Sequence, residues 1–375
     1  MTGWIALAAV GALLVLIPWV IYPWVMIQLG GTRPAPVGPP AQPGQLVSVV
    51  LATREPPEAV MARLQDILSG DWPASQLELV VAIDGDPSPY DIVGLSPAPC
   101  AIRVVSRGEH PGKAAALNAG VAAATGEVLV FADTAQRFEP QAIPRLIAAL
   151  EHGPWDAVSG ALQIGNEKEG GGLLARYWRL ERRLREAEAR VHSAIGVSGS
   201  IYAMRREHWT PLPAALILDD LWVPMRLILD GHRVGFEPGA VATDTRTTTP
   251  EQEYRRKVRT LTGNLQLVAW MPGVLLPWRN PAWLQFWCHK LLRLATPFAL
   301  LILLAGVTGA TFAASTALGA GLLGAGGGAV LLATLAPGAL CRKARGALRW
   351  GVAMQAAIVT ATWNGVRGRW DVWGR

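Results

Sequence analysis

Short apolar runs alternate with amphipathic stretches between residues 46 and 245, a pattern typical of an α/β domain. Runs rich in apolar residues predict strands at 47–53, 77–83, 102–105, 128–132, 157–162 and 200–204. Helical spacing predicts helices from Pro57, from Lys113 and over 140–151. Because strands and helices alternate, we expect a mostly parallel sheet that is covered on both faces.

An acidic residue stands at the carboxyl end of two of these strands. Asp84 follows the run 77–83 and precedes a glycine, and Asp133 follows the run 128–132. Between them, Lys113 opens an alanine-rich helix. Open α/β sheets bind ligands outside the carboxyl ends of their strands, so two carboxylates and a lysine at that edge predict a nucleotide-type ligand.

A different amphipathic pattern covers residues 173–191, where apolar side chains recur at spacings of four and three. Arginine and glutamate occupy most of the intervening positions. The pattern predicts a helix with a strongly basic outer side. Both a solvated surface helix and a helix at a membrane face fit this pattern.

Two parts of the chain are long and apolar. Residues 4–29 carry no charge and suit one bilayer span with aromatic residues near its ends. Because a positive amino-terminal stretch is missing, we expect a retained anchor and not a cleaved signal. Beyond residue 277, spans are predicted at 294–314 and 318–340, and 349–366 is either a third span or an interfacial helix.

Composition supports membrane segments, since 51% of the 375 residues are hydrophobic and only 17% are charged. The net charge of +6 comes from Lys and Arg beside apolar runs, which favours membrane lipids and phosphates as partners and no nucleic acid. The three cysteines are far apart and fit neither a disulfide framework nor a zinc site. They indicate a reduced, cytoplasmic setting.

Six motifs follow one another at 47–55, 83–85, 112–118, 131–133, 196–206 and 218–221. In combination they resemble the membrane-bound inverting glycosyltransferases of family 2, the group of cellulose, chitin and hyaluronan synthases. The resemblance implies a GT-A nucleotide-sugar-binding domain, α/β with a mostly parallel sheet, flanked by transmembrane helices. It also implies a multi-pass protein of the cell membrane, in a bacterium the inner membrane, with the catalytic domain in the cytoplasm.

The implied domains are a transmembrane helix at 1–29, a Pro- and Gly-rich linker at 30–45, a GT-A domain at 46–270 and a membrane region at 271–375. The implied reaction moves a sugar from a nucleotide sugar to a lipid-linked or saccharide acceptor. Two alternatives stay open. One is a catalytically weak partner subunit that binds a nucleotide or a lipid, and the other is a membrane nucleotidyltransferase.

The resemblance assigns donor binding to Thr53, Glu55, Asp84, Lys113, Asp133 and Arg259. Asp84 would accept a hydrogen bond from N3–H of uracil, which makes a UDP-sugar the expected donor. Lys113 would meet phosphate or ribose, helped by the positive end of its helix. Asp133 would hold a divalent cation, Mg²⁺ or Mn²⁺, that bridges the diphosphate.

Two positions depart from the family's pattern. Ala135 stands where a second acid is usual, which leaves the cation to Asp133, phosphate oxygens and water, with Gln136 nearby. In the Q-x-x-R-W motif, Arg259 is retained as a candidate diphosphate ligand, but Thr260 replaces the tryptophan that stacks on the acceptor sugar. Single or limited transfer to a membrane-proximal acceptor is therefore favoured over processive extrusion.

Asp220 is the candidate general base, which removes the acceptor proton while the hydroxyl oxygen attacks the anomeric carbon. Repulsion from Asp219 would raise its affinity for a proton. Ser198, Gly199 and Ser200, together with Asp219, are expected along the acceptor channel. A solvated acidic pair at a helix start and a purely structural turn are the alternatives.

Overall fold

A computed structural model describes the chain except for residues 34–40, 42–43, 89, 91–98, 107–111, 166–172, 247–248, 336–338 and 373–375. Most of the expected linker at 30–45 therefore lies outside the described residues. The chain forms two compact units. The α/β unit comprises Met26–Thr247 and Leu267–Trp283, and the helical unit comprises Met1–Val25, Thr248–Gln266 and Leu284–Arg375.

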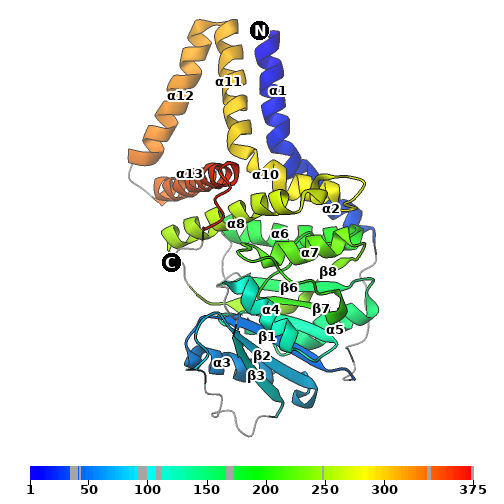
Figure 1. Cartoon of the computed structure of the whole chain (residues 1–375). Helices are drawn as coiled ribbons and strands as arrows, with labels where there is room; N and C mark the ends of the chain where they lie inside the picture. The colour runs from blue at the N-terminus through cyan, green and yellow to red at the C-terminus, as the bar shows by residue number, and fades with distance from the viewer. Residues whose placement is uncertain are drawn as a thin grey trace. The chain divides into compact units, whose positions relative to one another are not determined.

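The α/β unit is built on a sheet of eight described strands in the order β3-β2-β1-β4-β7-β6-β8-β5 (Figure 1). The strands are β1 Val47–Thr53, β2 Leu77–Ile83, β3 Ala101–Ser106, β4 Val128–Ala132, β5 Arg137–Phe138, β6 Ala157–Ile164, β7 Ile201–Arg205 and β8 Val234–Asp244. Every residue of β1, β2 and β4 is buried, as expected for continuous apolar runs covered on both faces.

The register of the parallel strands aligns their carboxyl ends. Thr53 of β1 pairs with Ile83 of β2, and Leu51 of β1 pairs with Ala132 of β4. Asp84 and Asp133 directly follow those strand ends. The same edge of the sheet therefore carries Thr53, Asp84 and Asp133, and we call it the carboxyl edge.

The expected mostly parallel sheet is correct for one half only, and the sheet as a whole is mixed. Four of the seven pairings between described strands are parallel, and three are antiparallel. The reversal occurs because the chain enters β7 at the edge where β4 ends, with Ile201 opposite Ala132. β8 and β5 were not predicted, since Pro238 and neighbouring glycines interrupt the apolar pattern of β8.

Among the described residues, five α-helices lie between successive strands of the sheet along the chain (Figure 1). They are α3 Pro57–Leu68, α4 Lys113–Ala123, α5 Ala142–His152, α6 Leu173–Val191 and α7 Asp219–Leu229. Helix α4 packs closely on the sheet, because a Cβ at Gly120 would lie 2.8 Å from Val50 Cγ1. Helix α6 confirms the amphipathic prediction in part: Leu184 is buried and Arg183 exposed, but Glu181 is buried as well.

The helical unit contains the apolar ends of the chain. Its main helices are α1 Thr2–Leu16, α11 Thr296–Ala314, α12 Thr316–Leu335, α13 Ala339–Val366 and most of α8 Pro250–Trp270. A π-helix at Ile17–Ile21 contains Pro18 and joins α1 to α2 Tyr22–Gly31. Among the described residues, Thr2–Gly31 and Thr296–Ala314 are long and apolar enough to cross a membrane, while the apolar helix Thr316–Leu332 is shorter.

Helices α1 and α11 lie side by side (Figure 1). A Cβ added at Gly11 would lie 2.5 Å from the backbone nitrogen of Leu303, and one at Gly306 would lie 2.3 Å from that of Ala8. Such close backbone approach requires glycine at both contacts and is typical of helix pairs in membranes. In the same unit, the hydroxyls of Tyr254 and Thr360 lie 3.0 Å apart and link α8 to α13.

Candidate active site

Lys113 lies among carboxylates at the carboxyl edge. Its Nζ is 3.1 Å from Oδ1 of Asp133 and 3.4 Å from Oδ2 of Asp219. Asp220 follows Asp219 at the start of α7, and its charge acts on Lys113 as well. We call Asp133, Asp219 and Asp220 the carboxylate cluster. The structure thus brings the predicted base, cation ligand and lysine together from three separate elements.

The electrostatics of this cluster keep Lys113 charged. Burial lowers the pKa of the Lys113 ammonium, but the negative charges of Asp133, Asp219 and Asp220 outweigh burial and raise the pKa above its ordinary value. The Lys113 side chain is still 27% exposed. A permanently charged ammonium that a solute can reach is suited to binding a phosphate group.

Asp84 connects the end of β2 to the start of α4. Its Oδ1 accepts a hydrogen bond from the backbone N–H of Gly112 at 2.9 Å, and its Oδ2 accepts one from Nε of Arg54. Gly112 has φ of +120°, a conformation that a side chain would strain, which explains glycine directly before Lys113. Asp84 therefore contacts the residue that directly precedes Lys113.

Thr53 and Glu55 lie in the loop after β1. Thr53 is buried, and its Oγ1 accepts hydrogen bonds from the backbone N–H of Glu55 at 2.9 Å and from the hydroxyl of Thr134 at 2.7 Å. Glu55 is exposed, and its carbonyl accepts a hydrogen bond from the hydroxyl of Tyr90 at 2.7 Å. The Thr53 hydroxyl thus joins the loop after β1 to the loop that follows Asp133.

The turn at residues 198–200 lies against the carboxylate cluster. The hydroxyls of Ser198 and Ser200 are buried and lie 3.0 Å apart. A Cβ at Gly199 would lie 3.4 Å from Cβ of Asp220 and 3.5 Å from Nζ of Lys113. The backbone N–H of Val197 donates to the Asp220 carbonyl at 2.9 Å, which fixes the turn to the start of α7.

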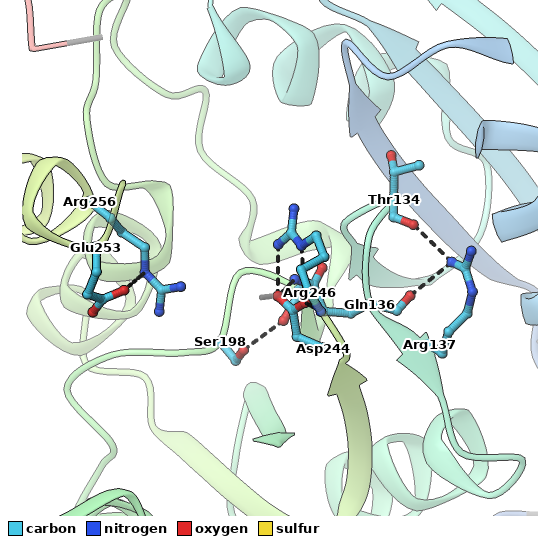
Figure 2. A network of polar contacts seen from close by, with 9 residues as sticks. Thr134, Gln136, Arg137, Ser198, Asp244, Arg246, Glu253 and Arg256 are labelled. Atoms are coloured by element: carbon cyan, nitrogen blue, oxygen red, sulfur yellow. Dashed lines mark hydrogen bonds and ion pairs between the residues drawn. The ribbon is translucent and has the colours of Figure 1, made fainter. Parts of the chain in front are cut away.

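A second cation, which the sequence analysis missed, lies at the same edge (Figure 2). Arg246 donates from Nη2 to Oδ2 of Asp244 at 2.8 Å and from Nε to Oδ1 at 3.0 Å, and Gln136 Nε2 donates to Oδ2 at 2.7 Å. The hydrogen bonds with Asp244 raise the pKa of Arg246, and the charges of Asp133 and Glu55 add to that effect. The sequence signal for Arg246 is its position two residues after Asp244, the acid that ends β8. This signal can be used only if β8 is recognised as a strand.

Arg63, also missed, supports the backbone beside Asp133. Its side chain is fully buried, and Nε donates to the Asp133 carbonyl at 3.0 Å. The guanidinium lies 4.0 Å from the centre of the Phe138 ring and pairs with Asp66. Burial lowers the pKa of Arg63 to about 10, against the opposing effect of Asp66. On an amphipathic helix such an arginine is ordinarily assigned to the solvent side, so no sequence pattern indicates this role.

Tyr202 lies beneath the cluster on β7. Its ring is fully buried and stacks on Phe131 of β4 with centroids 4.4 Å apart. Its hydroxyl has no hydrogen-bond partner among the described residues. Burial, together with the charges of Asp219, Asp220 and Asp133, raises the pKa of this hydroxyl well above its ordinary value. Tyr202 therefore stays neutral and offers a buried O–H close to the acids.

Arg259 belongs to α8 in the helical unit, whereas the other candidates belong to the α/β unit. One turn earlier on α8, Nε of Arg256 lies 4.0 Å from Oε2 of Glu253 (Figure 2). Thr260, which stands in the place of the expected tryptophan, donates its hydroxyl to the Arg256 carbonyl at 3.0 Å. Its side chain is thus engaged with its own helix.

The residues around Asp133 fit a hard divalent cation. The Asp133 carboxylate is 34% exposed, and Ala135 supplies no ligand atom. Three residues after Asp133, the buried Oε1 of Gln136 has no hydrogen-bond partner among the described residues. Oxygen donors of this kind suit Mg²⁺ or Mn²⁺. Asp133 and Gln136 Oε1 are the protein groups that would hold such an ion.

Residues 48–209 match the family model of glycosyl transferase family 2. The chain carries a glycosyltransferase domain. No curated protein matches the glycosyltransferase by sequence. Among solved structures it is similar to the mannosyltransferase PcManGT of Pyrobaculum calidifontis, solved with GDP-Man and Mn²⁺, over 97% of this chain and 99% of that chain, with 22% identity and a TM-score of 0.72.

Further similar structures cover only part of the glycosyltransferase. Glucosyl-3-phosphoglycerate synthase of Mycobacterium tuberculosis is 21% identical over 60% of this chain and 80% of that chain, with a TM-score of 0.42. TarS of S. aureus is 18% identical over 59% of this chain and 65% of that chain, with a TM-score of 0.39. The predicted glycosyltransferase class and GT-A fold are confirmed. The narrower likeness to cellulose, chitin and hyaluronan synthases stays a prediction.

Proposed function

We propose that the glycosyltransferase transfers a sugar from a nucleoside diphosphate sugar to an acceptor hydroxyl by single displacement, with inversion at the anomeric carbon. The observation that carries this proposal is the position of Lys113 among Asp133, Asp219 and Asp220 at the carboxyl edge. A fixed cation beside acids supplies both halves of the reaction: charge compensation for the departing diphosphate and a carboxylate that takes a proton.

The donor diphosphate would lie against Lys113 and Arg246, and the Arg246 side chain is 56% exposed. Both side chains now pair with carboxylates, so a diphosphate would exchange these ion pairs for stronger charge-assisted hydrogen bonds. Asp133 and Gln136 would hold Mg²⁺ or Mn²⁺. When bound, this cation neutralises negative charge on the diphosphate. The Mn²⁺ in the structure of the archaeal mannosyltransferase supports this assignment. We propose Arg259, on α8, as a further ligand of the diphosphate.

Asp220 would act as the general base. Its carboxylate takes the proton of the acceptor hydroxyl while the acceptor oxygen bonds to the anomeric carbon and the bond from that carbon to the diphosphate oxygen breaks. Asp219 pairs with Lys113 and would hold it in place. The turn at 198–200 would border the acceptor, because Gly199 leaves space beside Asp220 that a side chain would fill.

Asp84 would bind the nucleobase, with Thr53 and Glu55 beside it. Both Asp84 oxygens accept hydrogen bonds, but one of them is from Arg54, whose side chain is 61% exposed and can be displaced. We propose a UDP-sugar, since N3–H of uracil can donate to this carboxylate. Guanine also offers an N–H, and the GDP-Man in the archaeal mannosyltransferase makes GDP-sugars the first comparison.

We propose that α1 and α11 anchor the glycosyltransferase in the cell membrane, with the α/β unit in the cytoplasm. Support comes from the length and apolar composition of Thr2–Gly31 and Thr296–Ala314 and from the glycine contacts between the two helices. An acceptor at the membrane, either lipid-linked or a saccharide, follows from this location.

In the decisive experiment, detergent-purified full-length protein and membranes that contain it are incubated with radiolabelled UDP- and GDP-sugars in the presence of Mn²⁺. Lipid-soluble product is separated from water-soluble polymer, and the released nucleotide is identified. We expect nucleoside diphosphate release and labelled lipid-soluble product. Release of pyrophosphate would favour a nucleotidyltransferase. Donor binding without transfer or hydrolysis would favour a catalytically weak partner subunit.

A further inference from the structure

Three side chains with metal-binding atoms meet at one point outside the active site. Nε2 of His208 lies 3.4 Å from Oδ1 of Asp156, and Nδ1 of His232 lies 3.3 Å from Oδ2 of the same carboxylate. The two imidazole rings have centroids 3.9 Å apart. One ligand atom from each residue lies within 4.8 Å of the other two. We call these residues the His–Asp cluster.

The His–Asp cluster lies at the end of the sheet opposite the carboxyl edge. Asp156 directly precedes β6, His208 ends the 3₁₀ helix that follows β7, and His232 lies between α7 and β8. Strand β7 begins at the carboxyl edge, where Ile201 pairs with Ala132. Strand β6 runs antiparallel to β7, and β8 runs parallel to β6, so both β6 and β8 begin at the far end. The cluster is therefore separate from Lys113 and its acids.

Backbone hydrogen bonds hold all three segments in place. The N–H of Asp156 donates to the Arg233 carbonyl at 2.9 Å, and the N–H of Arg205 donates to the Asp156 carbonyl at 3.1 Å. The N–H of His232 donates to the Leu227 carbonyl at 2.9 Å, beside Gly231 with φ of +91°. Because these segments are already fixed, binding of an ion would cost little conformational entropy.

The separations suit a tetrahedral metal ion. Two ligand atoms at about 2.05 Å from a tetrahedral zinc ion lie about 3.3 to 3.4 Å apart. Each imidazole nitrogen lies at about this distance from one oxygen of Asp156: Nε2 of His208 is 3.4 Å from Oδ1, and Nδ1 of His232 is 3.3 Å from Oδ2. A set of two imidazoles and one carboxylate is typical of Zn²⁺, Co²⁺ or Ni²⁺ and not of Mg²⁺. The side chains are 20 to 31% exposed, so an ion can enter from solvent.

We propose that Asp156, His208 and His232 bind one divalent ion of the zinc class, which ties together the ends of β6, β7 and β8. Either water or Glu207 completes the coordination. The Glu207 side chain is 73% exposed, and its Oε1 lies 3.7 Å from Nε2 of His208. The site is structural, because it lies at the end of the sheet remote from the carboxylate cluster. It is distinct from the Mg²⁺ or Mn²⁺ that Asp133 would hold.

The test uses full-length protein with its affinity tag removed and its metals stripped by a chelator. Co²⁺ is titrated while the visible absorption of tetrahedral cobalt is recorded, and Zn²⁺ then competes for the site. The variants are His208→Gln and His232→Ala, with His152→Ala, an exposed histidine at the end of α5, as the matched control. Thermal unfolding with and without Zn²⁺ provides a second readout.

We expect about one equivalent of Co²⁺ in the parent and in H152A, and at least tenfold weaker binding in H208Q and H232A. Zn²⁺ should raise the midpoint of unfolding in the parent and not in H232A. If H232A does not fold, H208Q alone decides. Unchanged Co²⁺ binding in H208Q, or no transition-metal binding by the parent, would overturn the proposal.

Discussion

At the carboxyl edge, Lys113 lies among three carboxylates, whereas at the far end of the same sheet two imidazoles share the single carboxylate of Asp156. Oxygen donors beside fixed cations suit phosphates and hard cations, and imidazole nitrogens suit ions of the zinc class. Asp133 directly follows β4, and Asp156 directly precedes β6. The comparison teaches that the two ends of one sheet can select different metals through the donor atoms they present.

Asp220→Asn should have the largest effect, and it tests the catalytic side of the comparison. Without a carboxylate to take the acceptor proton, we expect sugar transfer to fall by about 10² to 10⁴-fold while donor binding stays intact. Initial rates and donor titrations measure the two quantities. Asp230→Asn, at the other end of α7, is the matched control and should transfer sugar normally. Normal transfer by D220N would remove Asp220 from the role of base.

Lys113→Met should weaken donor binding about tenfold to a hundredfold, as expected for the loss of a charge-assisted hydrogen bond to phosphate. Calorimetric titration with nucleoside diphosphate measures the change. Lys113→Arg keeps the charge and should recover part of the affinity. Equal affinity in K113M and the parent would show that the diphosphate lies elsewhere.

Glu78→Ala tests whether the far end of the sheet is structural. Glu78 lies near the start of β2, is buried, and accepts hydrogen bonds from Ser48, Arg103 and both the backbone and the hydroxyl of Thr125. Removing the Glu78 carboxylate leaves these buried donors without their hydrogen-bond acceptor. We therefore expect the free energy of unfolding to fall by about 3 kcal/mol. Thermal or denaturant unfolding measures the loss. Glu127→Ala, at an exposed site, should change stability by less than about 0.5 kcal/mol.

The pH dependence of the same contacts gives a further check. Burial raises the pKa of Glu78, but the hydrogen bonds from Ser48, Thr125 and Arg103 outweigh it and lower the pKa below its ordinary value. The stabilisation is therefore complete above the unfolded-state pKa and is lost as the pH falls through the folded-state pKa. In E78A, the midpoint of unfolding should decrease less steeply as the pH falls than it does in the parent. Equal slopes in parent and variant would contradict this assignment.

The smallest effect is expected at His192, which follows α6 near the same end. Burial lowers the pKa of its imidazole, and the charges of Arg233 and Arg33 lower it further. Because the folded-state pKa lies below the ordinary 6.5, stability falls as the pH drops from 6.5 through the folded-state value. His192→Gln should reduce this dependence below pH 6.5. An unchanged profile would assign the slope to other groups.

The local pattern of apolar residues was sufficient to predict the strands that carry the candidate site. It was not sufficient to predict all of the residues that form the site. Continuous apolar runs predicted β1, β2 and β4, and with them the placing of Asp84 and Asp133. The mixed half of the sheet was missed because an apolar run predicts that β7 is a strand but not its direction. Strand β8 was missed because Pro238 interrupts its apolar pattern. Arg246 and Arg63 were missed because their roles depend on contacts with residues distant in sequence, which no local periodicity reveals.

The glycine contact between α1 and α11 has a consequence for how the chain is made. Gly11 and its partner backbone at Leu303 belong to opposite ends of the sequence, so the first helix leaves the ribosome long before its neighbour exists. During that interval the surface of the first helix around Gly11 has no partner helix, while the α/β unit is synthesised. Assembly of the helix pair must therefore be a late event, and truncation of the chain before residue 296 should leave the first helix without its partner.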